Sequence, residues 1–216
     1  MSRTSPLPPR MLIFEDLAGS RGEKLLFAGV ELTLVAGEIA ELRGPNGIGK
    51  TTLLMIVAGV VRPAAGGVRI EGGDPDGRPE TEIGYFAHKP AIKPRLTVAE
   101  NLRFWGALNG SDKDGIEAAL ETVGLAPIAG LDAGYLSAGQ TRRLALARLL
   151  LSDRPIWLMD EPTSALDSQG EKLVADLIDA HLDRGGLVLA ATHHDLHLRH
   201  EARTIALSRP AASLAA

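Results

Sequence analysis

The sequence predicts an α/β fold with a mainly parallel core sheet. Short apolar runs alternate along the chain with longer helical segments, which is the order of elements in α/β proteins. Several of these runs consist entirely of apolar residues, as strands do when a parallel sheet is covered on both faces. The chain has 216 residues, of which 45% are hydrophobic, so it can form one domain with a well-packed core.

The first ninety residues contain most of the expected strands. Residues 18–22 (Ala-Gly-Ser-Arg-Gly) are interpreted as a turn that ends the first strand. The Pro- and Ser-rich residues 1–10 are expected to be a disordered tail, as are residues 209–216. The strands are short runs separated by Gly-containing turns, at residues 11–17, 30–35, 38–42, 68–70 and 83–86.

Helices dominate the next part of the chain, where residues 89–147 are expected to form a helical subdomain inserted into an α/β domain that spans residues 11–208. Thr97 and Glu100 have the spacing of a capping box at a helix start. Helices are expected at residues 97–108, 116–123, 137–151 and 168–183. The remaining strands are expected at residues 155–160, 187–192 and 202–207.

The amino-acid composition argues against several classes of protein. The net charge of −4 argues against a protein that coats nucleic acid through bulk electrostatics. The absence of cysteine excludes disulfides and thiolate metal sites. No stretch approaches the roughly 20 apolar residues of a membrane-spanning helix, and the N-terminus lacks the apolar core of a secretory signal. We therefore expect a soluble chain, whose role at a membrane would require a partner that supplies the spans.

A glycine-rich loop lies between the strand expected at residues 38–42 and an apolar helix. Residues 44–51 read Gly-Pro-Asn-Gly-Ile-Gly-Lys-Thr, which fits the phosphate-binding P-loop. Glycines let successive backbone N–H groups point at phosphate oxygens, and the following helix adds the positive end of its dipole. The expected nucleotide-binding residues here are Gly44, Pro45, Asn46, Gly47, Ile48, Gly49, Lys50, Thr51 and Thr52.

The side chains around this loop predict a site for ATP and Mg²⁺. Lys50 is expected to reach the β- and γ-phosphates, and the Thr51 hydroxyl group is expected to coordinate the metal. A P-loop also needs a metal-binding carboxylate on a neighbouring strand. Asp160 supplies one at the end of the apolar run Ile-Trp-Leu-Met. Glu161 follows it and is placed to activate the attacking water as general base.

Residues 136–140 read Leu-Ser-Ala-Gly-Gln and lie between these two motifs. They resemble the signature sequence Leu-Ser-Gly-Gly-Gln of the ATP-binding cassette (ABC) family, with one alanine for glycine. Residues 161–167 resemble the segment that joins the catalytic glutamate to the so-called D-loop, residues 164–167. Thr192-His193 resembles the switch histidine. The similarity covers residues 12–207. It implies an ABC cassette: a P-loop core, an antiparallel β portion and a helical subdomain.

The resemblance also implies a dimer. In this family two cassettes face head to tail, and each ATP lies between the P-loop of one and the signature of the other. Ser137, Ala138, Gly139 and Gln140 would then contact a nucleotide held by a second copy, with the Ser137 hydroxyl and the Gly139 N–H at the γ-phosphate. The residues implied as catalytic are Glu161, His193 and Lys50.

Two positions depart from the family pattern. The Q-loop glutamine normally lies nine residues before Thr97, where this chain has His88. Its imidazole is still able to touch metal or water, so His88 remains a candidate at the metal site. An aromatic side chain normally stacks on adenine, but residues 20–23 read Ser-Arg-Gly-Glu. Arg21 is the candidate to stack on the base instead, and the alternative is an exposed turn arginine.

These departures, with the runs at residues 91–97 and 100–104, resemble one ABC subfamily. It is the ATP-binding subunit of the cytochrome c biogenesis export complex, often called the haem exporter. The resemblance implies a homodimer of cassettes that works with integral membrane permease subunits and has no nucleic-acid partner. The implied location is peripheral, on the cytoplasmic face of the inner membrane.

Other functions share some of these motifs. The ATPase of another small-molecule ABC exporter would use the same hydrolysis residues with a different permease. A soluble ABC ATPase acting on nucleic acid or ribosomes commonly has two cassettes or a long coiled coil, and this chain has one cassette and no sustained heptads. A non-hydrolysing regulator is expected to lose Glu161, His193 or the signature, and all are present.

Four histidines lie in one short segment near the C-terminus: His193, His194, His197 and His200. Spacings of three and four would place pairs of them on one helix face. One interpretation is a metal or haem site. The other, which we favour, is that His193 is the switch and the rest form a polar, partly exposed face.

Overall fold

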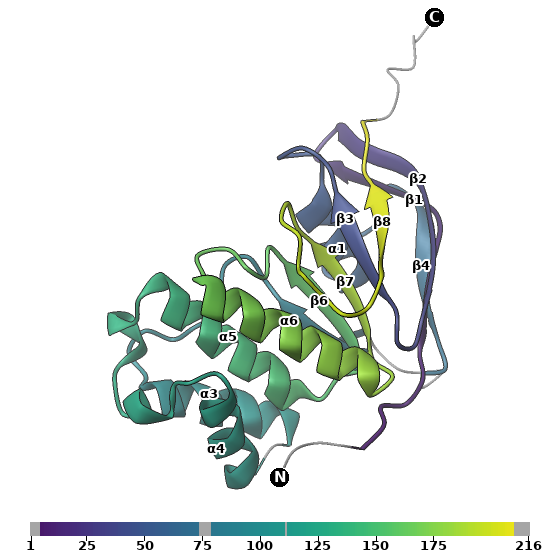
Figure 1. The fold of residues 1–216 in the computed structure, drawn as a ribbon. Coiled ribbons are helices and arrows are strands. Elements are labelled where there is room, and N and C mark those ends of the chain that lie inside the picture. Colours follow the sequence, from purple (N-terminus) through teal and green to yellow (C-terminus); the bar gives the residue numbers. More distant parts are fainter. Residues whose placement is uncertain (1–4, 74–78, 111, 210–216) are drawn as a thin grey trace, which may run out of the picture.

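The computed structural model describes residues 5–73, 79–110 and 112–209 (Figure 1). Its core is a five-stranded sheet in the order β5-β6-β7-β3-β8, in which every neighbouring pair is parallel. The strands are β3 (Ile39–Arg43), β5 (Ile83–Phe86), β6 (Ile156–Asp160), β7 (Leu187–Ala191) and β8 (Ala202–Ala206). The predicted α/β class with a mainly parallel core sheet is confirmed.

A second, antiparallel sheet has the order β2-β1-β4, formed by β1 (Met11–Arg21), β2 (Lys24–Val35) and β4 (Ala65–Glu71). The turn expected at residues 18–22 is wrong, because β1 continues to Arg21 with irregular register and the chain turns at residues 22–23. Gly19 serves packing rather than a turn: a Cβ there would lie 2.3 Å from the Phe27 ring. A glycine inside a strand often marks such a close approach.

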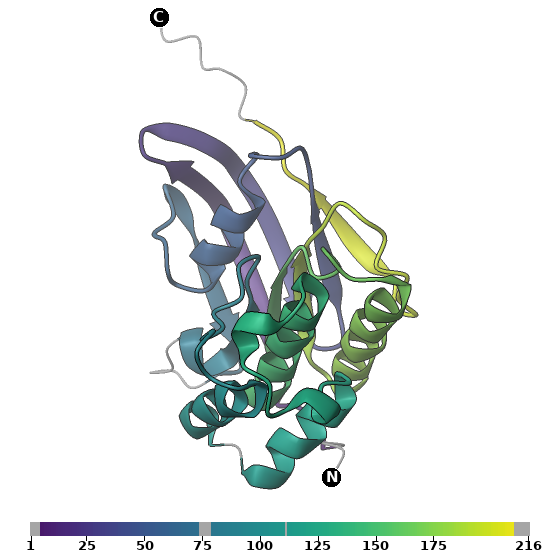
Figure 2. The same cartoon turned by 90° about the vertical axis from the view of Figure 1, so that its left-hand side faces the viewer.

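The helices divide between the two faces of the parallel sheet (Figures 1 and 2). Helix α1 (Lys50–Val57) packs in one core cluster with the antiparallel sheet and one face of the parallel sheet. The opposite face packs against α5 (Ala138–Ser152) and α6 (Ser168–Asp183). This arrangement covers both faces of the parallel sheet and explains why its strands are apolar throughout.

Two more helices, α3 (Val98–Asn109) and α4 (Lys113–Thr122), lie beyond α5, away from the antiparallel sheet (Figures 1 and 2). Both helices share a core cluster with α5. The predicted capping box of Thr97 and Glu100 is confirmed at the start of α3. Helix α2 (Pro79–Glu82) precedes β5, and two 3₁₀ segments, η1 (Ala126–Ile128) and η2 (Ala133–Tyr135), lead to α5.

The N-terminal segment is ordered further than the sequence predicted. Leu7 is buried, and its backbone N–H donates to the Arg184 carbonyl oxygen at 2.8 Å. The Arg10 guanidinium pairs with the Glu82 carboxylate at 2.7 Å. The predicted disordered tail is therefore wrong for residues 5–10, because one apolar side chain and these long-range contacts hold them against the domain. The predicted tail residues 1–4 and 210–216 lie outside the described residues.

In the described part of the chain, helices all fall short of the length and apolarity that crossing a membrane requires.

Candidate functional site

Four segments that are distant in sequence meet at one cavity of about 520 Å³. The loop between β3 and α1, with the first turn of α1, supplies half of its lining residues, at positions 46, 47 and 49–52. Arg21, with Lys24 and Leu26, comes from the antiparallel sheet; His88 follows β5; and Asp160 and Glu161 lie at the end of β6. The last two segments and the loop after β3 lie at the carboxyl ends of parallel strands, where α/β proteins bind their ligands. The structure thus collects most of the predicted P-loop, metal and base residues.

The loop at residues 44–49 has the backbone that the motif demands. Gly44 and Gly49 have φ angles of 148° and 114°, which side chains rarely permit. A Cβ on Gly44 would lie 2.9 Å from the Leu207 carbonyl oxygen, and one on Gly49 would lie 2.9 Å from the Phe27 ring. The Ile48 side chain is buried in the core, so the nucleotide contact predicted for this residue is left to its backbone.

Lys50 is buried and makes two hydrogen bonds across the site. Its Nζ donates to the Gly44 carbonyl oxygen at 2.9 Å and to His193 Nε2 at 2.7 Å. Because an ammonium group has no acceptor, a charged Lys50 requires this His193 nitrogen to be the acceptor of the pair. The same nitrogen lies 3.5 Å from Glu161 Oε1. The structure therefore brings the three predicted catalytic side chains into one group. Burial lowers the Lys50 pKa, and the Glu161 and Asp160 charges oppose that shift.

Thr51 and Asp160 meet as predicted for a metal site. The Thr51 hydroxyl donates to Asp160 Oδ2 at 2.9 Å, and Asp160 is almost fully buried. A hydroxyl and a carboxylate oxygen side by side are donors that suit Mg²⁺, which usually takes one or two protein ligands and the substrate phosphates. His88 is exposed on the wall of the same cavity.

Glu161 has a strained backbone. Its φ angle is 49°, in the left-handed region that non-glycine residues seldom adopt and that recurs at active sites. Its N–H donates to the Ala191 carbonyl oxygen at 2.8 Å, which continues the pairing of β6 with β7 by one residue. The chain therefore leaves the sheet abruptly at Glu161, with its side chain on the cavity wall.

The signature residues lie at a second cavity, of about 390 Å³, that shares no lining residue with the first. Ser137 and Gln140 form a capping box at the start of α5. Gly139 packs closely on the D-loop, since a Cβ there would lie 3.2 Å from the Ala165 carbonyl oxygen. Ser137 and Ala138 are exposed. Within one chain, the structure does not bring the signature to the P-loop.

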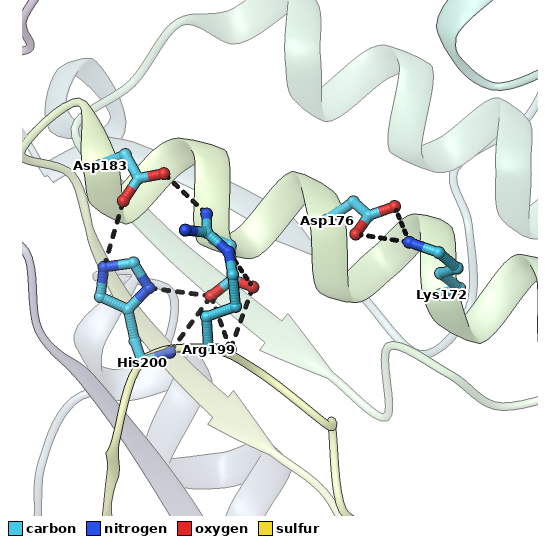
Figure 3. Close-up of polar contacts among 6 residues, drawn as sticks. Lys172, Asp176, Asp183, Arg199 and His200 are labelled. Atoms are coloured by element: carbon cyan, nitrogen blue, oxygen red, sulfur yellow. Dashed lines mark hydrogen bonds and ion pairs between the residues drawn. The ribbon is translucent and has the colours of Figure 1, made fainter.

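The segment after His193 is a loop rather than the helix that the histidine spacing suggested. Asp179 on α6 holds it: His200 Nδ1 lies 2.8 Å from Asp179 Oδ1, and the Arg199 N–H donates to the same carboxylate. Figure 3 shows His200 and Arg199 both reaching Asp183 on the same helix. Burial acts to raise the Asp179 pKa, but hydrogen bonds from His200 and Arg199 outweigh it and lower the pKa. Arg199 also pairs with Asp183 at 2.7 Å.

The alternative of a metal or haem site in this histidine segment gains no support. Among the described residues, no group of three or more His, Cys, Asp or Glu side chains is placed to hold a metal. His200 is engaged by Asp179, while His194 and His197 are exposed.

Sequence reasoning gave no role to one residue of the site, Arg142 on α5. Its guanidinium is buried and donates to backbone carbonyl oxygens on either side of the site, among them those of His88 and Asp160. The only available signal was a charged residue just before the apolar run of a helix, two positions after the signature.

Comparison with known proteins agrees with this set of motifs. The model of the family described as ABC transporter matches residues 27–164, a span that includes the P-loop, the signature and Glu161. The chain belongs to the ABC transporter family.

Curated ABC relatives share half of its sequence. The chain is 50% identical over 195 residues to the cytochrome c biogenesis ATP-binding export protein CcmA of Rhizobium johnstonii, covering 88% of this chain and 91% of the relative. It is also 50% identical to the Rhizobium meliloti protein of the same name, over 86% and 92% of the two chains.

Solved ABC structures share the fold. The dimeric, post-hydrolysis state of the ATP-binding cassette MJ0796, bound to ADP and Pi, superposes with a TM-score of 0.78 at 28% identity and covers 91% of this chain and 94% of that one. A putative ABC transporter ATP-binding protein from Pyrococcus furiosus also gives a TM-score of 0.78, at 24% identity, over 91% and 97% of the two chains.

Proposed function

We propose that this ABC protein is the ATP-hydrolysing subunit of an export complex for cytochrome c biogenesis. The grouping of Lys50, Glu161 and His193 beside the Thr51–Asp160 pair carries the hydrolysis part of the proposal. The 50% identity to cytochrome c biogenesis export proteins, over nearly all of both chains, supports the biological role.

Each side chain at the first cavity has a distinct part in hydrolysis. The glycine-rich loop and the N-terminus of α1 bind the phosphates of ATP. Lys50 exchanges its hydrogen bond with His193 for one with a phosphate oxygen, which frees His193 to contact the γ-phosphate. Glu161 accepts a proton from water as the water oxygen bonds to the γ-phosphorus, the bond to the β-phosphate oxygen breaks, and ADP leaves.

The remaining residues hold the other parts of the nucleotide. Thr51 and Asp160 would hold Mg²⁺, which when bound neutralises charge on the phosphate oxygens. His88, on the wall of the same cavity, would contact a water held by that metal. Arg21 lies on the wall of the cavity with Lys24 and Leu26, and we assign it to the face of the adenine, because a guanidinium is able to stack on a planar ring.

The second half of the site comes from a second copy. Ser137 and the N-terminus of α5 are exposed at their own cavity, and a helix N-terminus attracts anions. A head-to-tail homodimer would place the signature of each copy on the phosphates held by its partner. The dimeric cassette MJ0796 is a precedent for pairing in this fold.

The chain would act through permease subunits at the cytoplasmic face of the inner membrane, and those subunits would select the exported molecule. Its acidic net charge gives no support to a nucleic-acid partner.

The proposal is tested in the native host by deleting this chain and restoring either the parent or Glu161→Gln at equal abundance. Haem attached covalently to c-type cytochromes is then measured on denaturing gels. We expect haem attachment to be lost on deletion, restored by the parent and not restored by Glu161→Gln. Normal attachment in the deletion strain would reject the cytochrome c role.

Affinity purification from gently solubilised membranes, with mass spectrometry, provides a second test. Cytochrome c maturation permease subunits should be recovered. An unrelated permease would favour another ABC exporter, and recovery of soluble partners alone would reject transport.

A further inference from the structure

Arg142 connects the signature helix to the catalytic edge of the sheet. Its Nη1 donates to the carbonyl oxygens of Ala87 and His88, at 3.1 and 3.0 Å. Its Nη2 donates to those of Asp160, at 3.2 Å, and Glu161. One guanidinium therefore holds the backbone just beyond β5, where His88 lies, and at the end of β6, where Asp160 and Glu161 lie.

The surroundings of this guanidinium disfavour a charged group, because they remove it from water. Arg142 is 5% exposed, its guanidinium carbon lies 4.3 Å from the centre of the Phe86 ring, and its Nε is buried without a partner. Burial lowers its pKa, opposed by the charges of Asp160 and Glu161. A well-packed apolar side chain often serves stability as well as a buried charge does. The four carbonyl contacts therefore point to a purpose other than stability alone.

Arg148, six residues later on α5, gives a direct comparison. It too is largely buried: its Nη2 donates to the Tyr85 carbonyl oxygen at 3.1 Å, and its guanidinium carbon lies 4.6 Å from the Trp105 ring centre. Arg148 thus ties the same helix to β5, and none of its described contacts reaches β6. Only Arg142 of this pair contacts the backbone of Glu161.

We propose that Arg142 is a positioning residue, which fixes the Glu161 and His88 backbones relative to the signature helix. Its hydrogen bond to the Glu161 carbonyl stabilises the left-handed backbone, with φ of 49°, that directs the carboxylate into the cavity. Since the guanidinium is carried by α5, displacement of the signature by a partner's nucleotide is transmitted to the base. This inference rests on the proposed function, in which Glu161 is the base.

The test compares Arg142→Gln with Arg148→Gln in the purified full chain, measuring ATPase kcat, the KM for ATP and the melting temperature. Both variants lose a buried arginine of α5, so both should melt at a lower temperature. We expect Arg142→Gln to lower kcat about 30-fold, with KM changed less than about twofold; this corresponds to about 2 kcal/mol at the transition state. Arg148→Gln should keep kcat within about threefold of the parent.

Two further variants separate positioning from damage. Arg142→Lys keeps the charge, but its single ammonium group cannot reach the ends of both β5 and β6 as the two NH₂ groups of the guanidinium do. The variant should therefore recover part of the stability and little of kcat. It also replaces Arg142→Gln if that variant fails to fold. When Glu161→Gln is already present, adding Arg142→Gln should reduce the residual single-turnover rate less than about twofold, because both changes act through one group.

Two results would overturn the inference: a kcat loss in both arginine variants that follows their melting temperatures, or an undiminished 30-fold loss on top of Glu161→Gln. The proposed function fails separately, when the parent shows no ATPase activity or Glu161→Gln leaves it intact.

Discussion

The P-loop cavity and the signature cavity differ in how complete they are within one chain. At the first, Lys50, Thr51, Asp160 and His193 contact one another across segments that are more than a hundred residues apart. At the second, the side chains of Ser137 and Gln140 make their hydrogen bonds within the capping box of their own helix. The first is an assembled site, while the second is an exposed helix end.

This difference teaches which part of the chemistry belongs to the chain and which to the assembly. The residues that we propose for metal binding, for the general base and for the switch lie at strand ends that the fold itself brings together. The signature, by contrast, is the exposed positive end of a helix, and Asp167, a carboxylate that lines its cavity, is paired with Arg143. Arg142 is the internal connection between the two.

The largest expected effect concerns the first cavity. Glu161→Gln removes the proton acceptor and leaves the side-chain volume almost unchanged, so turnover should fall about 10³-fold, within the range for loss of a general base. ATP binding should persist, and size-exclusion chromatography with ATP should show a trapped dimer. Turnover near that of the parent would mean that another residue is the base.

A somewhat smaller effect is expected at the signature. Ser137→Asp keeps a good helix cap but puts a carboxylate against the phosphates of the partner's ATP, and such like-charge contacts cost several kcal/mol. Turnover should fall about 100-fold. Ser137→Asn, which caps without charge, should lose much less.

Mixing variants tests whether the two cavities join across a dimer. In an equal mixture of Lys50→Ala and Ser137→Asp chains, half of the dimers are mixed and each of those has one intact site, so activity should return to about a quarter of the parent rate. If mixing restores nothing, the two halves do not combine in trans.

A fourth prediction concerns His181, which lies outside both cavities and whose ring stacks on that of Trp157, with the ring centres 3.9 Å apart. Burial lowers its pKa from 6.5 to about 4, opposed by its hydrogen bond with the Pro155 carbonyl oxygen. The unfolded chain binds this proton first, so stability is full above pH 6.5 and falls as the pH drops towards 4, by about 3 kcal/mol.

Urea unfolding at pH 7.5 and pH 4.5 measures this difference, with His181→Gln as the control that still has an N–H for the Pro155 carbonyl. The control should show a smaller loss on acidification. An equal loss in both proteins would mean that other groups cause the acid sensitivity.

The smallest effect compares two helix caps. Ser137→Ala and Thr97→Ala each remove a capping-box side chain and should each lower the unfolding free energy by about 1 kcal/mol. Only Ser137→Ala should also slow turnover, because only that hydroxyl faces the partner's nucleotide. Equal effects of both variants on turnover would remove the special role of Ser137.

Local patterns predicted much of this molecule. The P-loop, the capping box at Thr97 and the apolar core strands depend on residues that are close in sequence, so the sequence was sufficient to place them. The errors arose where distant residues decide. Gly19 suggested a turn, but the close approach of the Phe27 ring explains it. Leu7 was assigned to a tail, but its backbone hydrogen bond to Arg184, just beyond α6, holds it to the domain.

Contacts between distant residues also explain why the sequence did not reveal Arg142 and why it wrongly suggested a helix in the histidine segment. The partners of Arg142 are backbone carbonyl oxygens at and just beyond the ends of two strands. Every residue has a carbonyl, so no residue type marks them. The loop after His193 is held by Asp179 from α6 rather than by its own helical periodicity.

The strand order has a consequence for how the protein is made. Strand β3, which leads into the P-loop, lies between β7 and β8, and these are the last two strands in the described chain. Ribosomes add roughly 5–20 residues per second, so the wait between the synthesis of β3 and that of its neighbours is on the order of ten seconds. During that wait the nascent chain carries the nucleotide-binding motif without the sheet that orients it, and it gains the ability to bind ATP only after β7 and β8 have been made.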